Sequence, residues 1–94
     1  MAPVRIALVG SGMIGRRHIE VLQGNPGLHV LAAIADPAPA AEQLAGDLGV
    51  PCYASHEQLL DREKPDGIII ATPNQLHASV GLACIERRVP MLVE

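Results

Sequence analysis

The chain has 94 residues, of which 49% are apolar and 18% are charged, and its formal net charge is −3. This length suits one small domain or part of a larger one. The negative charge argues against a protein that binds the phosphate backbone of nucleic acids. Tyr53 is the one aromatic residue, which argues against a surface for base stacking. The sequence therefore predicts a small globular domain that does not bind nucleic acid.

Membrane and metal partners are also disfavoured. No apolar run approaches the roughly 18 residues of a membrane span, and the first apolar run is too short for a secretory signal. Cys52 and Cys84 lie far apart and form no Cys-x-x-Cys motif, which predicts reduced thiols rather than a disulfide or a metal site. We therefore expect a cytoplasmic protein with no membrane partner and no bound metal.

The first half of the chain alternates between two hydrophobic periods. A continuous apolar run predicts a strand over Val4–Val9, and apolar residues at helical spacing predict a helix over Met13–Gln23. A second apolar run predicts a strand over Leu28–Ala35. The following segment, Pro39–Leu48, has a helical pattern, and Gly49 is placed to end that helix.

The second half of the chain repeats this alternation with shorter elements. Ser55 can cap a helix, with Gln58 three residues on as its capping-box partner. The expected elements are a strand over 51–53, a helix over 57–62, a strand over 67–71, a helix over 76–87 and a strand over 90–93.

Strands that are apolar on both faces and separated by helices predict a parallel sheet that is covered on both sides. Because crossover connections are right-handed, few topologies remain. We predict a Rossmann-type doubly wound α/β sheet of five strands in the order 3-2-1-4-5, with helices on both faces. The fifth strand would form an unpaired edge, and such edges pair with other chains, so self-association through this strand is expected.

A glycine-rich turn, Gly10-Ser11-Gly12-Met13-Ile14-Gly15, joins the first strand to the first helix. In a dinucleotide-binding turn the first glycine permits the tight turn, the second lets the pyrophosphate approach the backbone, and the third allows close helix packing. The phosphates would then face the amide groups of Gly12, Met13 and Ile14 at a helix start. An ordinary structural turn is the alternative. A P-loop is disfavoured, because no Gly-Lys-Ser/Thr follows.

Asp36 ends the second predicted strand, 21 positions after Gly15. A carboxylate there can accept hydrogen bonds from both hydroxyls of the adenosine ribose and would repel a 2′-phosphate. Residues 37–41 contain no Arg or Lys to bind such a phosphate. The sequence therefore favours NAD over NADP. The alternative is that Asp36 is the N-cap of the helix over 39–48, and the two roles are compatible.

Three segments resemble the glucose–fructose oxidoreductase / inositol dehydrogenase (Gfo/Idh/MocA) family. They are residues 6–15 together with His18, the segment from Ala71 to His77, and residues 89–94. The resemblance implies that residues 1–94 are an NAD(P)-binding Rossmann domain, truncated before a carboxyl-terminal catalytic domain. It also implies that the nicotinamide half of the groove is lined by Thr72, Pro73, Asn74 and His77. An ordinary helix-face histidine is the alternative for His77.

The family's Glu-Lys-Pro motif follows the fifth strand, where its Glu contacts the nicotinamide ribose and its Lys assists catalysis. By resemblance Glu94 is this glutamate, and the lysine would follow it, so no catalytic residue is expected in this chain. The same three residues occur at Glu63-Lys64-Pro65, before the fourth predicted strand and therefore at the amino end of the sheet, opposite the expected cofactor site. We interpret that copy as a solvated helix end.

These features predict the nicotinamide-dinucleotide-binding portion of an oxidoreductase that acts on a sugar, a polyol or a related small molecule. The chain alone would bind the cofactor without turnover, because the substrate pocket would lie in the missing domain. Two alternatives stay open: a non-enzymatic NAD(H)-sensing module, and another dehydrogenase family such as a biliverdin-reductase-like or amino-acid dehydrogenase.

Overall fold

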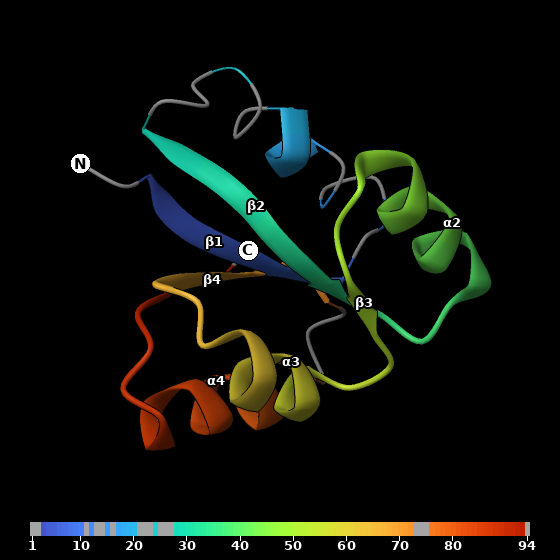
Figure 1. The fold of residues 1–94 in the computed structure, drawn as a ribbon. Coiled ribbons are helices and arrows are strands. Elements are labelled where there is room, and N and C mark those ends of the chain that lie inside the picture. The colour runs from blue at the N-terminus through green and yellow to red at the C-terminus, as the bar shows by residue number, and fades with distance from the viewer. Residues whose placement is uncertain are drawn as a thin grey trace.

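A computed structural model of the chain describes residues 3–10, 12, 15, 17–20, 24, 28–72 and 76–93. Gly15 and residues 17–20 are helical, as predicted for the first helix. The labelled elements in Figure 1 are β1 (Val4–Val9), β2 (His29–Ala35), α2 (Pro39–Leu48), β3 (Cys52–Tyr53), α3 (His56–Glu63), β4 (Gly67–Ile70), α4 (His77–Glu86) and β5 (Met91–Val93).

The five strands form one sheet in the order β3-β2-β1-β4-β5, and each neighbouring pair is parallel. The predicted order is therefore confirmed. β1 is the central strand: Val9 is paired with Ala35 of β2 on one side and with Ile70 of β4 on the other. The register between β1 and β2 shifts once, between Ile6 and Ala7.

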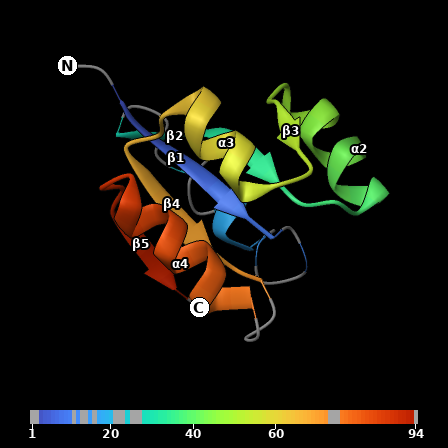
Figure 2. The ribbon, with the colours of Figure 1, turned by 90° about the horizontal axis from the view of Figure 1, so that it is seen from below.

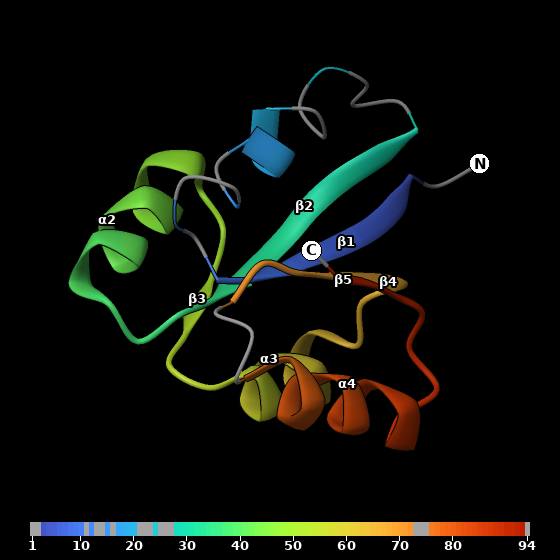
Figure 3. The same cartoon turned by 180° about the vertical axis from the view of Figure 1, so that it is seen from behind.

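Side chains alternate along each strand and so form a core on each face of the sheet, and helices cover both faces. Figures 1 and 3 show α3 and α4 together on one face and α2 on the other. The view from below in Figure 2 shows α3 and α4 in front of the sheet, running roughly along β1 and β4. Ala7 and Val9 of β1 belong to the core under α3 and α4, whereas Leu8 packs with Ile19 and Ile34 on the other face. This apolar core on both sides is what a parallel sheet requires.

Local sequence signals place the helix ends. Ser55 is the N-cap of α3, and its hydroxyl accepts a hydrogen bond from the Gln58 amide at 3.2 Å. α2 ends at Gly49, whose left-handed φ of 72° suits a residue without a side chain. Both features follow the sequence prediction.

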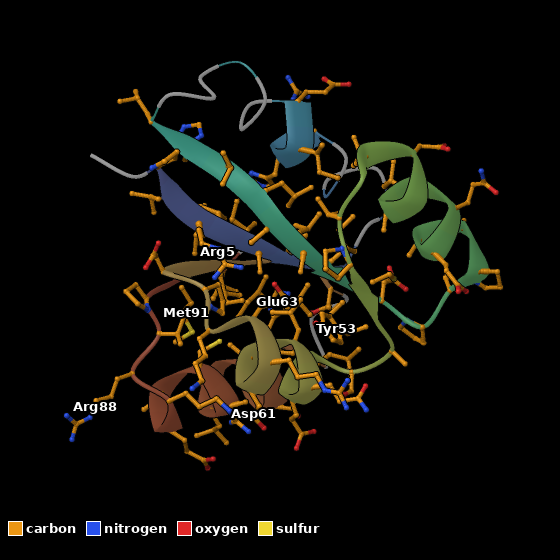
Figure 4. All side chains as sticks on the ribbon, in the orientation of Figure 1. Arg5, Tyr53, Asp61, Glu63, Arg88 and Met91 are labelled. Atoms are coloured by element: carbon orange, nitrogen blue, oxygen red, sulfur yellow. The ribbon has the colours of Figure 1, made fainter. Side chains whose placement is uncertain are left out.

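A cluster around Glu63 joins β1, β3 and α3 on the face of the sheet that α3 covers (Figure 4). The Arg5 guanidinium donates to Glu63 Oε1 at 3.0 Å and to the Glu63 carbonyl at 2.6 Å, and the Tyr53 hydroxyl donates to Glu63 Oε2. The Arg5 amide donates to Asp66 Oδ2 at 2.8 Å. We call Arg5, Tyr53, Glu63 and Asp66 the Glu63 cluster.

The expectation of a solvated helix end at Glu63-Lys64-Pro65 is wrong for Glu63, whose side chain is 16% exposed. α3 does end there, and Lys64 takes the left-handed conformation with φ of 47°. The sequence pattern could not show that Arg5 and Tyr53, distant in the chain, fold onto this carboxylate.

Candidate functional site

A cleft of about 790 Å³ opens at the carboxyl ends of β1, β2 and β4. Its volume lies within the range typical of small-molecule sites. β1 lies between β2 and β4, and the chain crosses from β1 to opposite faces of the sheet on its two sides, which makes this a topological switch point. The strand ends contribute the following lining residues: Val9, Gly10, Ala35, Asp36, Ala71 and Thr72.

The three glycines of the turn differ in whether the surrounding protein leaves space for a Cβ. Gly10 has φ of 93°, and a Cβ there would lie 2.7 Å from the Ala71 carbonyl oxygen. A Cβ on Gly15 would overlap the Gly10 carbonyl oxygen. A Cβ on Gly12 would meet no heavy atom of the other described residues within 4 Å. Packing therefore explains Gly10 and Gly15, whereas Gly12 leaves open space in the wall of the cleft.

Asp36 follows β2 and lines the cleft. Its amide donates to the Tyr53 carbonyl at 2.9 Å, and its Oδ1 accepts a hydrogen bond from the Ala38 amide at 2.9 Å. The N-cap of α2 is Ala38, with no side-chain cap, so the alternative that Asp36 is this N-cap is wrong. The carboxylate instead closes a local Asx-type turn, which fixes its position at the cleft.

Thr72 forms the opposite wall of the cleft, two residues after the end of β4. Its Oγ1 is buried and has no hydrogen-bond partner among the residues that the structure describes. His77 Nε2 lies 2.8 Å from the Thr72 carbonyl oxygen. Among the described residues that line the cleft, Thr72 is present and His77 is not.

The remaining predicted site residues fall outside the described part of the chain. They are Met13, Ile14, Pro73, Asn74 and Glu94. Their predicted roles in cofactor binding stay predictions.

Sequence reasoning missed part of the lining. The segment from Ala54 to His56 borders the cleft beside Asp36, and Leu76 and Ser79 border it beside Thr72. The signal for the first segment was available, because the carboxyl end of the third parallel strand must meet the same edge of the sheet as the first two.

The charge on the cleft wall comes from Asp36, and no Lys or Arg borders the cleft among the described residues. Burial raises the pKa of the nearby Cys52 thiol, and the carboxylates of Glu42 and Asp36 raise it further. Cys52 and Cys84 are both free thiols. Because the pKa of Cys52 is raised, its thiol stays protonated near neutral pH and supplies no anionic nucleophile. Within the described ranges, no cluster of three or more His, Cys, Asp or Glu side chains is arranged to hold a metal ion.

No helix in the part of the chain that the structure describes has the length and apolar character needed to cross a bilayer.

Comparison with known families matches residues 4–94 to the oxidoreductase family with an NAD-binding Rossmann fold, Gfo/Idh/MocA. The chain belongs to this family. The match spans the glycine turn, Asp36 and the segment after β4, so the resemblance noted in the sequence is confirmed.

Several Gfo/Idh/MocA proteins are similar to this chain over nearly its whole length. The rhizopine catabolism protein MocA of Rhizobium meliloti is 33% identical over 100% of the chain and 29% of its own length. The WlbA dehydrogenase of Chromobacterium violaceum, solved with NADH and UDP-GlcNAcA, superposes with a TM-score of 0.92 at 28% identity, over 99% of this chain and 27% of that one. A myo-inositol dehydrogenase of Corynebacterium glutamicum superposes with a TM-score of 0.85 at 37% identity, over 97% and 27%. The chain thus spans less than a third of the length of these relatives.

Proposed function

We propose that the chain binds NAD in the cleft at the carboxyl edge of the sheet and orients its nicotinamide for hydride transfer in a longer oxidoreductase. The observation that carries this proposal is the pairing of Gly12, which leaves open space in the wall, with Asp36 on the same cleft. Such a site suits a pyrophosphate at a helix start and a ribose at the end of β2. Family membership supports it, since WlbA, a relative, was solved with NADH.

NAD is proposed in preference to NADP. The Asp36 carboxylate would accept hydrogen bonds from the ribose hydroxyls, and it would repel a 2′-phosphate. The residues after it, Pro37 to Ala41, carry no positive charge, and no Lys or Arg borders the described cleft. A 2′-phosphate would therefore lack a partner.

The reaction of the longer protein is proposed to be oxidation or reduction of a sugar, a polyol or a related small molecule. The myo-inositol dehydrogenase and WlbA, which was solved with UDP-GlcNAcA, are relatives of this kind. The bound dinucleotide supplies or accepts the hydride, and this chain binds and orients it. The 94-residue chain itself is expected to show no turnover with such substrates. A cytoplasmic location stays a prediction.

Calorimetric titration with NAD⁺ and NADP⁺ tests the cofactor assignment. Asp36→Ala should weaken NAD⁺ binding about tenfold or more, because hydrogen bonds to a charged group are worth about 1.5–3 kcal/mol, and it should leave NADP⁺ binding equal or stronger. Asp47→Ala is the matched control, since Asp47 is an exposed carboxylate outside the cleft lining. Equal weak binding of both dinucleotides, unchanged by Asp36→Ala, would refute the assignment.

A non-enzymatic NAD(H)-sensing module is the second candidate. It would use the same cleft, so the cofactor titration does not separate it from the enzyme. The gene beyond Glu94 does: a Lys-Pro and a further domain of about 200 residues or more favour the enzyme, whereas a stop codon or a DNA-binding segment favours the sensor.

Self-association of the 94-residue chain is also proposed. Met91, Leu92 and Val93 of β5 are 39%, 53% and 46% exposed, and β5 is paired on one side by β4. An exposed apolar edge strand is a template for another copy. Light scattering at high concentration should give a mass above that of the monomer. Leu92→Glu should reduce this mass, whereas Leu82→Glu, at an exposed position of α4, should not. A monomeric wild-type mass would contradict this.

A further inference from the structure

The hydrogen bond between His77 and Thr72 spans the exit of β4 and the start of α4. The two atoms, His77 Nε2 and the Thr72 carbonyl oxygen, are 2.8 Å apart, and the pair is partly buried. A carbonyl oxygen can only accept a hydrogen bond, so Nε2 must carry the proton. The geometry therefore fixes the tautomer of this imidazole as well as its direction.

Thr72 lies just beyond the backbone hydrogen bonds that join β4 to β1. The ladder between β1 and β4 continues to the Ala71 amide, which donates to the Val9 carbonyl at 2.8 Å. One residue later, the Thr72 hydroxyl has no partner among the described residues. The bond from His77 to the Thr72 carbonyl thus restrains a residue that lies just beyond the ladder and forms a wall of the cleft.

The position of this wall also bears on the glycine turn. The Ala71 carbonyl and the Thr72 amide nitrogen would lie 2.7 and 3.0 Å from a Cβ on Gly10. A displacement of Thr72 would therefore alter the contact between the exit of β4 and the first glycine of the turn.

His77 itself is placed differently. It is absent from the described lining of the cleft, although Leu76 and Ser79 on either side of it are present. α4 has no side-chain N-cap, because its N-cap residue is Leu76, and the His77 side chain turns back to the strand exit instead. These contacts give His77 a role within the protein rather than at the ligand.

We propose that His77 is a positioning residue that holds Thr72 against the cleft through its carbonyl and does not contact the dinucleotide. This inference rests on the proposed function, because it concerns the wall of the same cofactor site. The resemblance led us to expect that His77 lines the groove. The proposed role is narrower: His77 positions Thr72, and the proton on Nε2 is the feature that this role requires.

Two substitutions separate this role from ligand contact. His77→Gln keeps an N–H donor at nearly the position of Nε2, whereas His77→Leu keeps bulk without a donor. Calorimetry with NAD⁺ should show about three- to tenfold weaker binding for His77→Leu, the range that the loss of one hydrogen bond gives, and wild-type binding within twofold for His77→Gln. Wild-type affinity in His77→Leu, or equal losses in both variants, would overturn the proposal.

A second measurement applies to the protein without ligand. Long-range ¹H–¹⁵N NMR spectra of the imidazole should show the Nε2–H tautomer, with its proton protected from exchange. The Nδ1–H tautomer, or an imidazole that samples both, would overturn the proposal even if a variant failed to fold. Failure of the proposed function would look different: wild type would not bind NAD⁺, while the Nε2–H signature persisted.

Discussion

The two ends of the central strand are built in contrasting ways. At the amino end of β1, Arg5 forms a 3.0 Å ion pair with Glu63, and the Tyr53 hydroxyl reaches the same carboxylate from β3. At the carboxyl end, glycines, backbone groups and the short side chains of Asp36 and Thr72 surround the cleft. The comparison teaches that cross-linking side chains lie away from the proposed site, where a ligand can approach bare backbone.

This contrast predicts that stability and binding can be changed separately, and a pair of glycines gives the largest effects. Gly10→Ala places a Cβ against the Ala71 carbonyl at a φ of 93°, so it should destabilise the fold by about 2–4 kcal/mol and abolish NAD⁺ binding. The new Cβ of Gly12→Ala meets no atom of the other described residues within 4 Å, so the free energy of unfolding should stay within about 0.5 kcal/mol of wild type.

Gly12→Ala should nevertheless weaken NAD⁺ binding at least tenfold, since the new methyl occupies space proposed for the pyrophosphate. Urea unfolding and calorimetry measure the two quantities. If Gly12→Ala bound NAD⁺ as wild type does, the turn would be structural only, as the alternative interpretation of this motif holds.

The Glu63 cluster should show the reverse behaviour. Glu63→Gln removes the charge from a side chain that is 16% exposed. Its partner Arg5 is 43% exposed, so water screens the ion pair. We therefore expect the free energy of unfolding to fall by only about 1–2 kcal/mol. NAD⁺ affinity should stay within twofold of wild type. The control is Glu57→Gln, an exposed carboxylate of the same helix. A large loss of affinity in Glu63→Gln would show that the two ends are coupled.

A substitution at Thr72 should change stability and NAD⁺ binding in opposite directions. Thr72→Val deletes a buried hydroxyl that has no partner in the described part of the chain, so stability should be unchanged or rise by up to about 1 kcal/mol. NAD⁺ binding should fall several-fold if the bound dinucleotide is the missing partner. Thr72→Ser keeps the hydroxyl and is the control for binding. Unchanged affinity in Thr72→Val would remove this hydroxyl from the site.

The smallest effect is expected from a surface pair far from the cleft. Arg87 Nε donates to Asp61 Oδ1 at 2.7 Å, and this hydrogen bond lowers the pKa of the Asp61 carboxyl. Because the pKa of Asp61 is lower in the folded than in the unfolded state, its bond to Arg87 stabilises the fold above about pH 4. This stabilisation is lost as the pH falls through the lowered pKa. Asp61→Asn should therefore lose less stability than wild type between pH 5 and pH 2. Equal acid dependence in urea unfolding, at low salt, would contradict this.

Much of the fold could be predicted because local and global signals agree. The apolar runs at Val4–Val9 and Gly67–Ile70, the cap at Ser55 and the stop at Gly49 each require only nearby residues, and the strand order follows from crossover handedness. The Glu63 interpretation was wrong because its partners, Arg5 and Tyr53, are 58 and 10 residues away.

The candidate site was predicted in part for the same reason. Gly10, Gly12 and Asp36 carry sequence signals, and the structure brings them to one cleft. The bond from His77 to the Thr72 carbonyl has no such signal, because it depends on how β4 meets α4. The contribution of Ala54 to His56 was accessible from the strand order and was overlooked.

The central claim is that the carboxyl edge of the sheet binds NAD. Titration of the ¹⁵N-labelled chain with NAD⁺ tests it most directly, with amide shifts followed at both ends of the strands. We predict saturable shifts at Gly10, Gly12, Asp36 and Thr72, with Gly67, at the amino end of β4, unmoved. Shifts centred on Gly67 and its neighbours, or no saturable shifts at millimolar NAD⁺, would contradict it.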